Sequence, residues 1–168
     1  MPERLTRRAA LLIGLAVFAL DRISKYLVEA RVSAFDVKPV IPGFFDIVKS
    51  HNAGVAFGFL SESSSSLRTA VLIAFSLVAL AVVGTMLWRI ARLDRPTAIG
   101  LSLIFGGALG NVLDRVLQGS VTDFLDFHVG DYHWYTFNVA DTAISSGAIL
   151  ILLGMLRANP ARTGKVAG

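Results

Sequence analysis

Two aspartates, Asp123 and Asp141, are the residues of this sequence best suited to acid–base chemistry. Asp123 lies in the apolar segment Val-Thr-Asp-Phe-Leu, and Asp141 is the one charge interrupting the stretch that runs from residue 132 to residue 156. An apolar setting disfavours ionised carboxylates, and two of them brought together there share one proton. Such a pair supplies an acid and a base near neutral pH, the arrangement by which aspartic proteases activate water against an amide. Asp126 is a second candidate for the first position, and spacing alone favours Asp123 only slightly.

Other polar side chains gather near the ends of apolar stretches, where an ionisable group is costly and is commonly functional. Three pairs at spacings of three or four residues would each share a helix face: Asp21 with Lys25, Asn111 with Arg115, and Asn138 with Asp141. The alternative role is structural, because the first of these pairs, and Asp114 with Arg115, could instead hold helices together. The small-residue run Gly106–Gly110 is typical of close helix packing.

Other catalytic chemistries fit the sequence less well. The histidines, His51, His128 and His133, have none of the spacings typical of zinc sites. Ser24 and Lys25 are adjacent, so on a helix they do not face each other as a catalytic dyad would. There is no glycine-rich phosphate loop with a lysine. We therefore expect neither a metal ion nor a cofactor.

The composition indicates which kind of protein must position these residues. Of the 168 residues, 54% are hydrophobic and 17% are charged, and the mean hydropathy is +0.64. Soluble domains are about 45–50% apolar and about 25% charged, so the chain is expected to be an integral membrane protein. The net charge is +4, but so few charges argue against a nucleic-acid-binding chain. The absence of cysteine excludes disulfides and a cysteine nucleophile.

Four stretches approach the length of about 20 mostly apolar residues that a membrane-spanning helix needs. The predicted spans are 9–28, 68–88, 97–116 and 137–156, with outer loops at 29–67 and 117–136 in a single domain covering 1–168. The first could instead be a cleaved signal peptide, but no small-x-small cleavage site follows Leu20, and we expect it to be retained. The sequence thus predicts an all-α membrane protein with four transmembrane helices.

The basic residues predict the orientation of these spans. Nine of the 16 lie in segments that alternate correctly for one side of the membrane: Arg4, Arg7, Arg8, Arg89, Arg92, Arg95, Arg157, Arg162 and Lys165. Residues 118–137 contain none. By the positive-inside rule, both termini are cytoplasmic and the two longer loops face outward. The first outer loop has aromatic and β-branched residues between Pro and Gly, which predicts a small β-sheet on the outer membrane surface.

Five sequence blocks in a fixed order add a specific resemblance. They are Asp21–Lys25, His51–Phe57, Gly106–Arg115, Gly119–Phe124 and Phe137–Asp141. Over about residues 10–156, the chain resembles the bacterial lipoprotein signal peptidase family, the type II signal peptidases. The resemblance implies an aspartyl endopeptidase of the bacterial inner membrane, with its active site towards the periplasm. It would remove signal peptides from prolipoproteins, cutting before the lipid-modified cysteine.

The resemblance also assigns roles to residues. It places the catalytic pair at Asp123 and Asp141, in preference to Asp126. The matching substrate-binding or supporting positions are Asp21, Lys25, Asn52, Gly54, Asn111, Arg115, Asn138 and Ala140. The expected partners are lipid-modified prolipoproteins and membrane lipids, with no nucleic acid, and the simplest state is a monomer.

Two other functions stay open when the residues alone are considered. In a small proton-coupled transporter, the buried acids would relay protons. In a non-catalytic membrane scaffold, they would matter for assembly alone. Without the resemblance, the peptidase and the transporter are nearly equal, because spacing does not establish that Asp123 and Asp141 meet in space.

Overall fold

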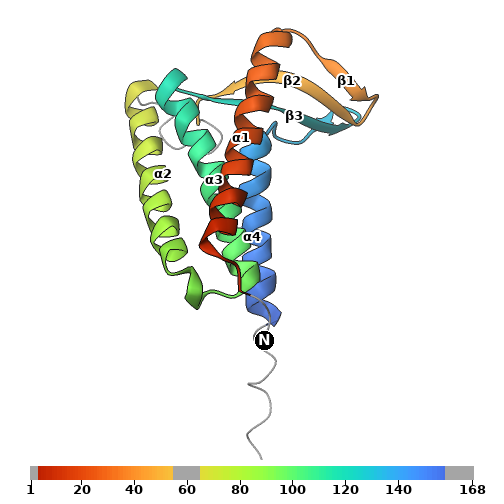
Figure 1. Ribbon diagram of the computed structural model, residues 1–168. Coiled ribbons are helices and arrows are strands. Elements are labelled where there is room, and N and C mark those ends of the chain that lie inside the picture. Colours follow the sequence, from red (N-terminus) through yellow and green to blue (C-terminus); the bar gives the residue numbers. More distant parts are fainter. Residues whose placement is uncertain (1–3, 55–64, 158–168) are drawn as a thin grey trace, which may run out of the picture.

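A computed structural model describes residues 4–54 and 65–157, and within these it contains four long helices and a four-stranded antiparallel sheet (Figure 1). The helices are α1 (Arg7–Arg31), α2 (Ser65–Trp88), α3 (Arg95–Gln118) and α4 (Val139–Arg157), with a 3₁₀ turn at Ile90–Arg92. The strands are β1 (Lys38–Ile41), β2 (Phe45–Asn52), β3 (Val121–Val129) and β4 (Tyr132–His133). The prediction of a mostly helical membrane protein with a small sheet is confirmed. The end of the sequence block at 55–57 lies outside the described residues.

Three of these helices are long and apolar enough to cross a membrane: Ser66–Trp88, Arg95–Gln118 and Val139–Leu156. The fourth long helix, α1, has 25 residues and so extends about 37 Å, which exceeds a hydrocarbon core of about 30 Å. Its charged residues Asp21, Arg22 and Lys25 lower its hydropathy. Each stretch expected to span the membrane falls on one of the four helices.

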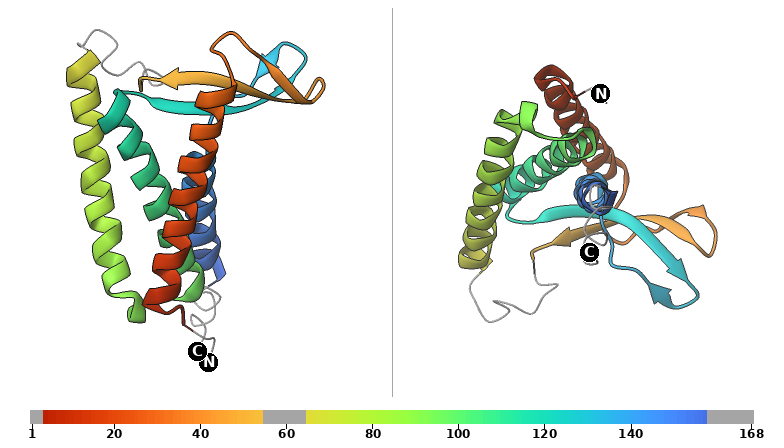
Figure 2. Two further views of the ribbon diagram at one scale, coloured as in Figure 1. Left: turned by 45° about the horizontal axis from the view of Figure 1, so that its top comes forward. Right: turned by 90° about the horizontal axis from the view of Figure 1, so that it is seen from below.

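Helix α3 lies between the other helices, and glycines let them approach it closely (Figure 2). A Cβ atom on Gly107 would lie 2.5 Å from the backbone oxygen of Ala140 in α4, and one on Gly106 would collide with the backbone of Gly14 in α1. Small residues at such crossings allow backbone-to-backbone packing. The run Gly106–Gly110 therefore has the packing role that its composition indicates.

Both ends of α3 are set by local sequence. The side chain of Asp94 accepts a hydrogen bond from the Thr97 backbone N–H at 3.2 Å and caps the first turn. The helix ends at Gly119, whose φ of 77° is the left-handed conformation that glycine adopts without strain. This turn leads the chain directly into β3, the strand that contains Asp123.

The sheet has the strand order β1-β2-β3-β4 and lies across one end of the helix bundle, extending to one side (Figures 1 and 2). The pairing of β2 with β3 places Ser50 opposite Asp123 and Asn52 opposite Val121. Strands were expected in the first outer loop, where β1 and β2 form, but not in the second, where β3 and β4 form. Acidic residues at positions 123 and 126 obscure the strand pattern of β3, because they are buried rather than solvent-facing.

Candidate active site

Asp123 lies buried at the junction between the sheet and the helix ends, with its side chain held by two asparagines. The residue is 3% exposed. Its Oδ1 accepts a hydrogen bond from Asn138 Nδ2 at 2.6 Å, and its Oδ2 accepts one from Asn52 Nδ2 at 3.0 Å. The two donors come from the start of α4 and the end of β2. Asp123 is therefore oriented from both sides by neutral amides.

Asp141 is connected to Asp123 through the side chain of Asn138. The Asn138 Oδ1 atom accepts the backbone N–H of Asp141 at 3.0 Å, which is the geometry of a helix N-cap. The same amide group donates through Nδ2 to Asp123. Asp141, which is half-buried, also accepts a hydrogen bond at Oδ1 from Asn111 Nδ2 at 2.8 Å. One capping residue thus fixes the first turn of α4 and joins the two acids.

The surroundings of Asp123 favour its protonated form. Burial raises the pKa of Asp123 to about 6, and the negative charge of Asp141 acts in the same direction. Hydrogen bonds from Asn52 and Asn138, and the charge of Lys25, partly oppose this shift. The two carboxylates are therefore close enough for the charge of one to affect proton binding by the other.

A buried ionic cluster supports the site from α1. Lys25, which is 1% exposed, lies 2.9 Å from Asp21 and 2.8 Å from Asp114, measured between Nζ and carboxylate oxygens. Its Nζ also donates to Asn111 Oδ1 at 3.0 Å, which leaves the Asn111 amide nitrogen to donate to Asp141. The predicted structural pairing of Asp21 with Lys25 is thus present, and Lys25 also orients Asn111, which donates to Asp141.

Two expected supporting residues act through their backbones. The N–H of Ala140, which is fully buried, donates to Asp21 Oδ1 at 3.0 Å and ties α4 to α1. The N–H of Gly54 donates to Asn52 Oδ1 at 2.8 Å, so the Asn52 amide nitrogen points to Asp123. Gly54 has a φ of 81°, where any other residue would be strained.

The chain's family follows from comparison with known proteins. A family model described as Signal peptidase (SPase) II matches residues 13–157. The chain belongs to the signal peptidase II family. The resemblance inferred from the five sequence blocks is therefore confirmed. Together with the apolar helices, membership makes this chain a membrane-embedded protease and favours the peptidase over a transporter.

Relatives and solved structures agree with this membership. A protein of Solibacter usitatus (strain Ellin6076) named lipoprotein signal peptidase is 54% identical over 145 residues, covering 86% of this chain and 88% of the relative. One of the same name from Geobacter metallireducens (strain ATCC 53774 / DSM 7210 / GS-15) is 42% identical, covering 82% and 84%. A solved structure described as a bacterial membrane enzyme, determined by the in meso method at 2.3 Å resolution, superposes with a TM-score of 0.83. It is 29% identical and covers 100% of this chain and 99% of that one.

In this signal peptidase II chain, the rival acid Asp126 lies outside the cluster. Among the described residues, the side-chain partner of Asp126 comes from β4, whereas Asp123 is held by Asn52 and Asn138. The Asp126 Oδ2 atom lies 2.8 Å from His133 Nδ1. Among the described residues, no group of three or more His, Cys, Asp or Glu side chains could hold a metal ion.

Arg115 and Asp114 do not form the structural pair that was one interpretation of the sequence. Among the described residues, the ion-pair partners of Asp114 are Lys25 and Arg22, both from α1. Adjacent residues on a helix point in different directions, which explains why Asp114 turns to α1 instead. Arg115 is half-buried, and its Nη1 donates to the Asn111 backbone oxygen at 3.3 Å. Its charge lies within range of both Asp123 and Asp141.

Sequence reasoning missed Thr122 as part of the site. Thr122 is 1% exposed, and its backbone oxygen accepts from Asn138 Nδ2 at 3.3 Å. Its hydroxyl donates to Glu29 Oε1 at 3.0 Å, and its N–H donates to Asp114 Oδ2 at 3.4 Å. The sequence feature that could have identified Thr122 is its position next to Asp123 in the block Gly119–Phe124.

Proposed function

We propose that this chain cleaves lipid-modified prolipoproteins as an aspartic-type endopeptidase, with Asp123 and Asp141 as its catalytic pair. Its family membership makes it a peptidase that removes signal peptides from prolipoproteins. The observation that supports the aspartic mechanism is the bridge through Asn138, which contacts both acids in a mostly buried polar cluster. Burial that raises the pKa of one acid, while the other acid stays more exposed, is the arrangement that separates an acid from a base.

In the proposed reaction, a water molecule lies between the two carboxyl groups. Asp141, ionised, takes a proton from the water as its oxygen attacks the scissile carbonyl carbon. Asp123, protonated, donates its proton to the carbonyl oxygen, which gives a tetrahedral diol. A proton then passes from Asp141 to the leaving nitrogen, and the C–N bond breaks while Asp123 takes back a proton from one diol hydroxyl. The products are a carboxyl terminus and the free amine of the lipidated cysteine, and both aspartates return to their starting protonation states. The apparent pKa values of this reaction belong to the pair.

The other cluster residues act as positioning groups. Asn52, Asn111 and Asn138 donate hydrogen bonds that orient the two carboxylates. Lys25 on α1 orients Asn111 by donating a hydrogen bond to its side-chain oxygen. Arg115 has a buried Nε without a hydrogen-bond partner among the described residues, so it has donor capacity for a substrate carbonyl.

The distribution of charge supports a bacterial inner-membrane location with the acids towards the periplasm. The basic residues near the start of α1, around the 3₁₀ turn and at the end of α4 lie at the end of the bundle opposite the sheet (Figure 1). By the positive-inside rule this end is cytoplasmic, so four helices including α1 cross the membrane within one domain. The sheet rests on the outer surface, the substrate's acyl chains stay in lipid, and one copy of the chain completes the site.

Cleavage and proton flux measured on the same liposomes test this function. Purified protein is reconstituted with a diacylglyceryl-modified precursor, and both product formation and internal pH are followed. The proposal predicts cleavage before the modified cysteine with no proton flux above that of empty liposomes. Proton-coupled flux without cleavage would instead support the transporter.

A further inference from the structure

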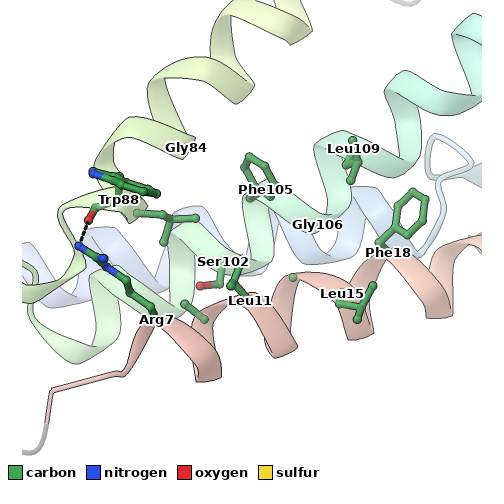
Figure 3. Close-up of a pocket in the computed structure, with 13 residues that line it drawn as sticks. Arg7, Leu11, Leu15, Phe18, Gly84, Trp88, Ser102, Phe105, Gly106 and Leu109 are labelled. Carbon is green, nitrogen blue, oxygen red and sulfur yellow. Dashed lines mark hydrogen bonds between the residues drawn. The ribbon is translucent and has the colours of Figure 1, made fainter.

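An apolar cavity lies between α1, α2 and α3, at the end of the bundle away from the two aspartates. Its volume is about 360 Å³, within the range of about 300–1,000 Å³ found for ligand sites. Figure 3 shows Arg7 and Trp88 at one end and Phe18 and Leu109 at the other. Its lining is apolar except for Arg7 and Ser102, and the Ser102 hydroxyl is used in a hydrogen bond to the Ala98 backbone oxygen at 2.7 Å. The interior therefore suits a hydrocarbon chain.

Glycines on α1, α2 and α3 line this space, so their positions contribute no side chains to fill it. Gly14 and Gly106 bring α1 against α3, while α2 contributes Gly84 to the cavity wall. A Cβ atom on Gly84 would meet only Phe105 Cε2, at the ordinary contact distance of 3.5 Å. The exposed side chains of Leu11 and Leu15 border the cavity, so it opens laterally towards lipid.

Arg7 places a cation at the mouth of the cavity. Its Nη2 donates to the Trp88 backbone oxygen at 2.9 Å, and its guanidinium carbon lies 5.0 Å from the centroid of the Trp88 ring. A guanidinium has five N–H donors, so most remain available. Arg7 lies in the first turn of α1, which contains no acid, and the helix dipole disfavours a cation there. An external anion would compensate this charge.

The same end of the protein is strongly basic, and the cavity is about as long as one lipid leaflet is thick. Besides Arg7, the basic residues near this cavity end include Arg4, Arg8, Arg89, Arg92 and Arg95, whereas Asp94 is engaged in capping α3. From Arg7 to Phe18 the cavity follows α1 for about 16 Å. Half of a hydrocarbon core is about 15 Å. Trp88, which is 72% exposed, has the amphipathic character of a residue at the membrane interface.

We propose that this cavity binds one anionic phospholipid from the leaflet on the Arg7 side. One acyl chain fills the space between α1, α2 and α3, and the phosphodiester accepts hydrogen bonds from Arg7. The site is separate from the aspartate cluster and does not depend on the assignment of the catalytic pair.

Fluorescence quenching by brominated lipids tests the proposal. The chain has two tryptophans, so Trp134→Phe leaves Trp88 as the only reporter. This variant is reconstituted in phosphatidylcholine vesicles that contain increasing fractions of phosphatidylglycerol, with either lipid brominated in turn. The proposal predicts that phosphatidylglycerol is preferred about fivefold at Trp88, the scale expected for one basic residue at an anionic lipid. Arg7→Gln removes this preference, and Arg7→Lys restores part of it.

Two further variants separate a site from general surface charge. Arg8→Gln removes the same charge from a residue that does not line the cavity, and it should keep the preference. Gly84→Leu fills the cavity while leaving Arg7 in place, and it should weaken quenching by phosphatidylglycerol, with Gly84→Ala giving a smaller change. Thermal unfolding of each variant establishes that it remains folded.

Three outcomes would overturn the proposal. Equal quenching by the two lipids in the Trp134→Phe protein would mean that no anionic lipid is selected. Equal loss of preference in Arg7→Gln and Arg8→Gln would assign it to diffuse electrostatics. A raised KM for precursor cleavage in Gly84→Leu, with the lipid preference unchanged, would assign the cavity to the substrate's signal helix.

Discussion

The side-chain amide of Asn138 donates to Asp123 at 2.6 Å. The same side chain caps α4 by accepting the Asp141 N–H at 3.0 Å. A capping residue is normally replaceable by another good cap, because the helix requires only an oxygen acceptor. Here the nitrogen of the same group orients a carboxylate, so the two roles can be separated by mutation.

The first prediction uses this separation. Asn138→Ser keeps an N-cap oxygen but loses the donor to Asp123, so kcat should fall at least tenfold while the unfolding temperature changes little. Asn138→Ala loses both, so it should lose the same activity and also about 1 kcal/mol of stability. Cleavage kinetics and thermal unfolding in detergent measure the two effects. Wild-type kcat in Asn138→Ser would contradict the positioning role.

A second prediction concerns the buried charge of Lys25. Lys25→Met leaves Asp21 and Asp114 buried without their shared cation, which should lower the free energy of unfolding by about 3–5 kcal/mol. Lys38→Met is the matched control, because Lys38 and its partner Asp36 are exposed. Such a surface pair contributes about 0–1 kcal/mol. Equal stability of the two variants in denaturant titrations would disprove a structural role for the cluster.

The pH dependence of cleavage provides a third prediction. Asp123 must be protonated to act as the acid, and burial raises its pKa to about 6, so kcat/KM should fall as the pH rises above about 6. The hydrogen bond from Asn52 lowers the pKa of Asp123, so Asn52→Ala should raise it and move this decline to higher pH. Asp126→Asn should leave the decline in place. A decline that moves to lower pH in Asn52→Ala would refute the assignment of Asp123 as the acid.

The raised pKa of Asp123 also makes the free energy of unfolding depend on pH. The folded protein binds the Asp123 proton more tightly than the unfolded chain, whose aspartate pKa is about 3.9. The stabilising contribution is therefore complete below about pH 4 and is lost as the pH rises towards 6. Between about pH 4 and pH 6, Asp123→Asn should therefore lose less stability than the wild type. Thermal unfolding at several pH values measures this difference.

A fourth prediction tests the close approach of α3 and α4. A methyl group at Gly107 would collide with the Ala140 backbone oxygen, so Gly107→Ala should separate the helices and weaken the hydrogen bond from Asn111 to Asp141. We expect at least a tenfold loss of kcat/KM. Gly84→Ala is the control on α2, where the added methyl meets only ordinary contact. Comparable activity of both variants would show that the spacing is not critical.

The sequence predicted the helices and both candidate acids because those signals are local. Low charge content reveals long apolar helices, and an aspartate within such a setting is conspicuous. The partners of Asp114 could not be predicted in this way. Asp114 and its partner Arg22 are 92 positions apart, and their contact depends on how α1 packs against α3.

Strand pairing was hidden for a similar reason. Nothing in the spacing of Asn52 and Asp123 indicates that β2 and β3 are neighbours, since 71 positions separate the two residues. What separates Asp126 from the cluster is its contact with His133 in β4, which the spacing within the segment does not indicate. Most residues of the site lie within the five blocks. The site itself forms only when contacts such as Asn52 to Asp123 and Asn111 to Asp141 join different blocks.

The most direct test of the account is cleavage of a diacylglyceryl-modified precursor by three variants with the same chemical change. Asp123→Asn and Asp141→Asn should each reduce kcat at least a thousandfold, while inserting in the membrane and unfolding as cooperatively as the wild type. Asp126→Asn, at the buried acid that contacts His133, should keep most activity. Near-normal cleavage by either of the first two variants would contradict an aspartate pair as the catalytic centre.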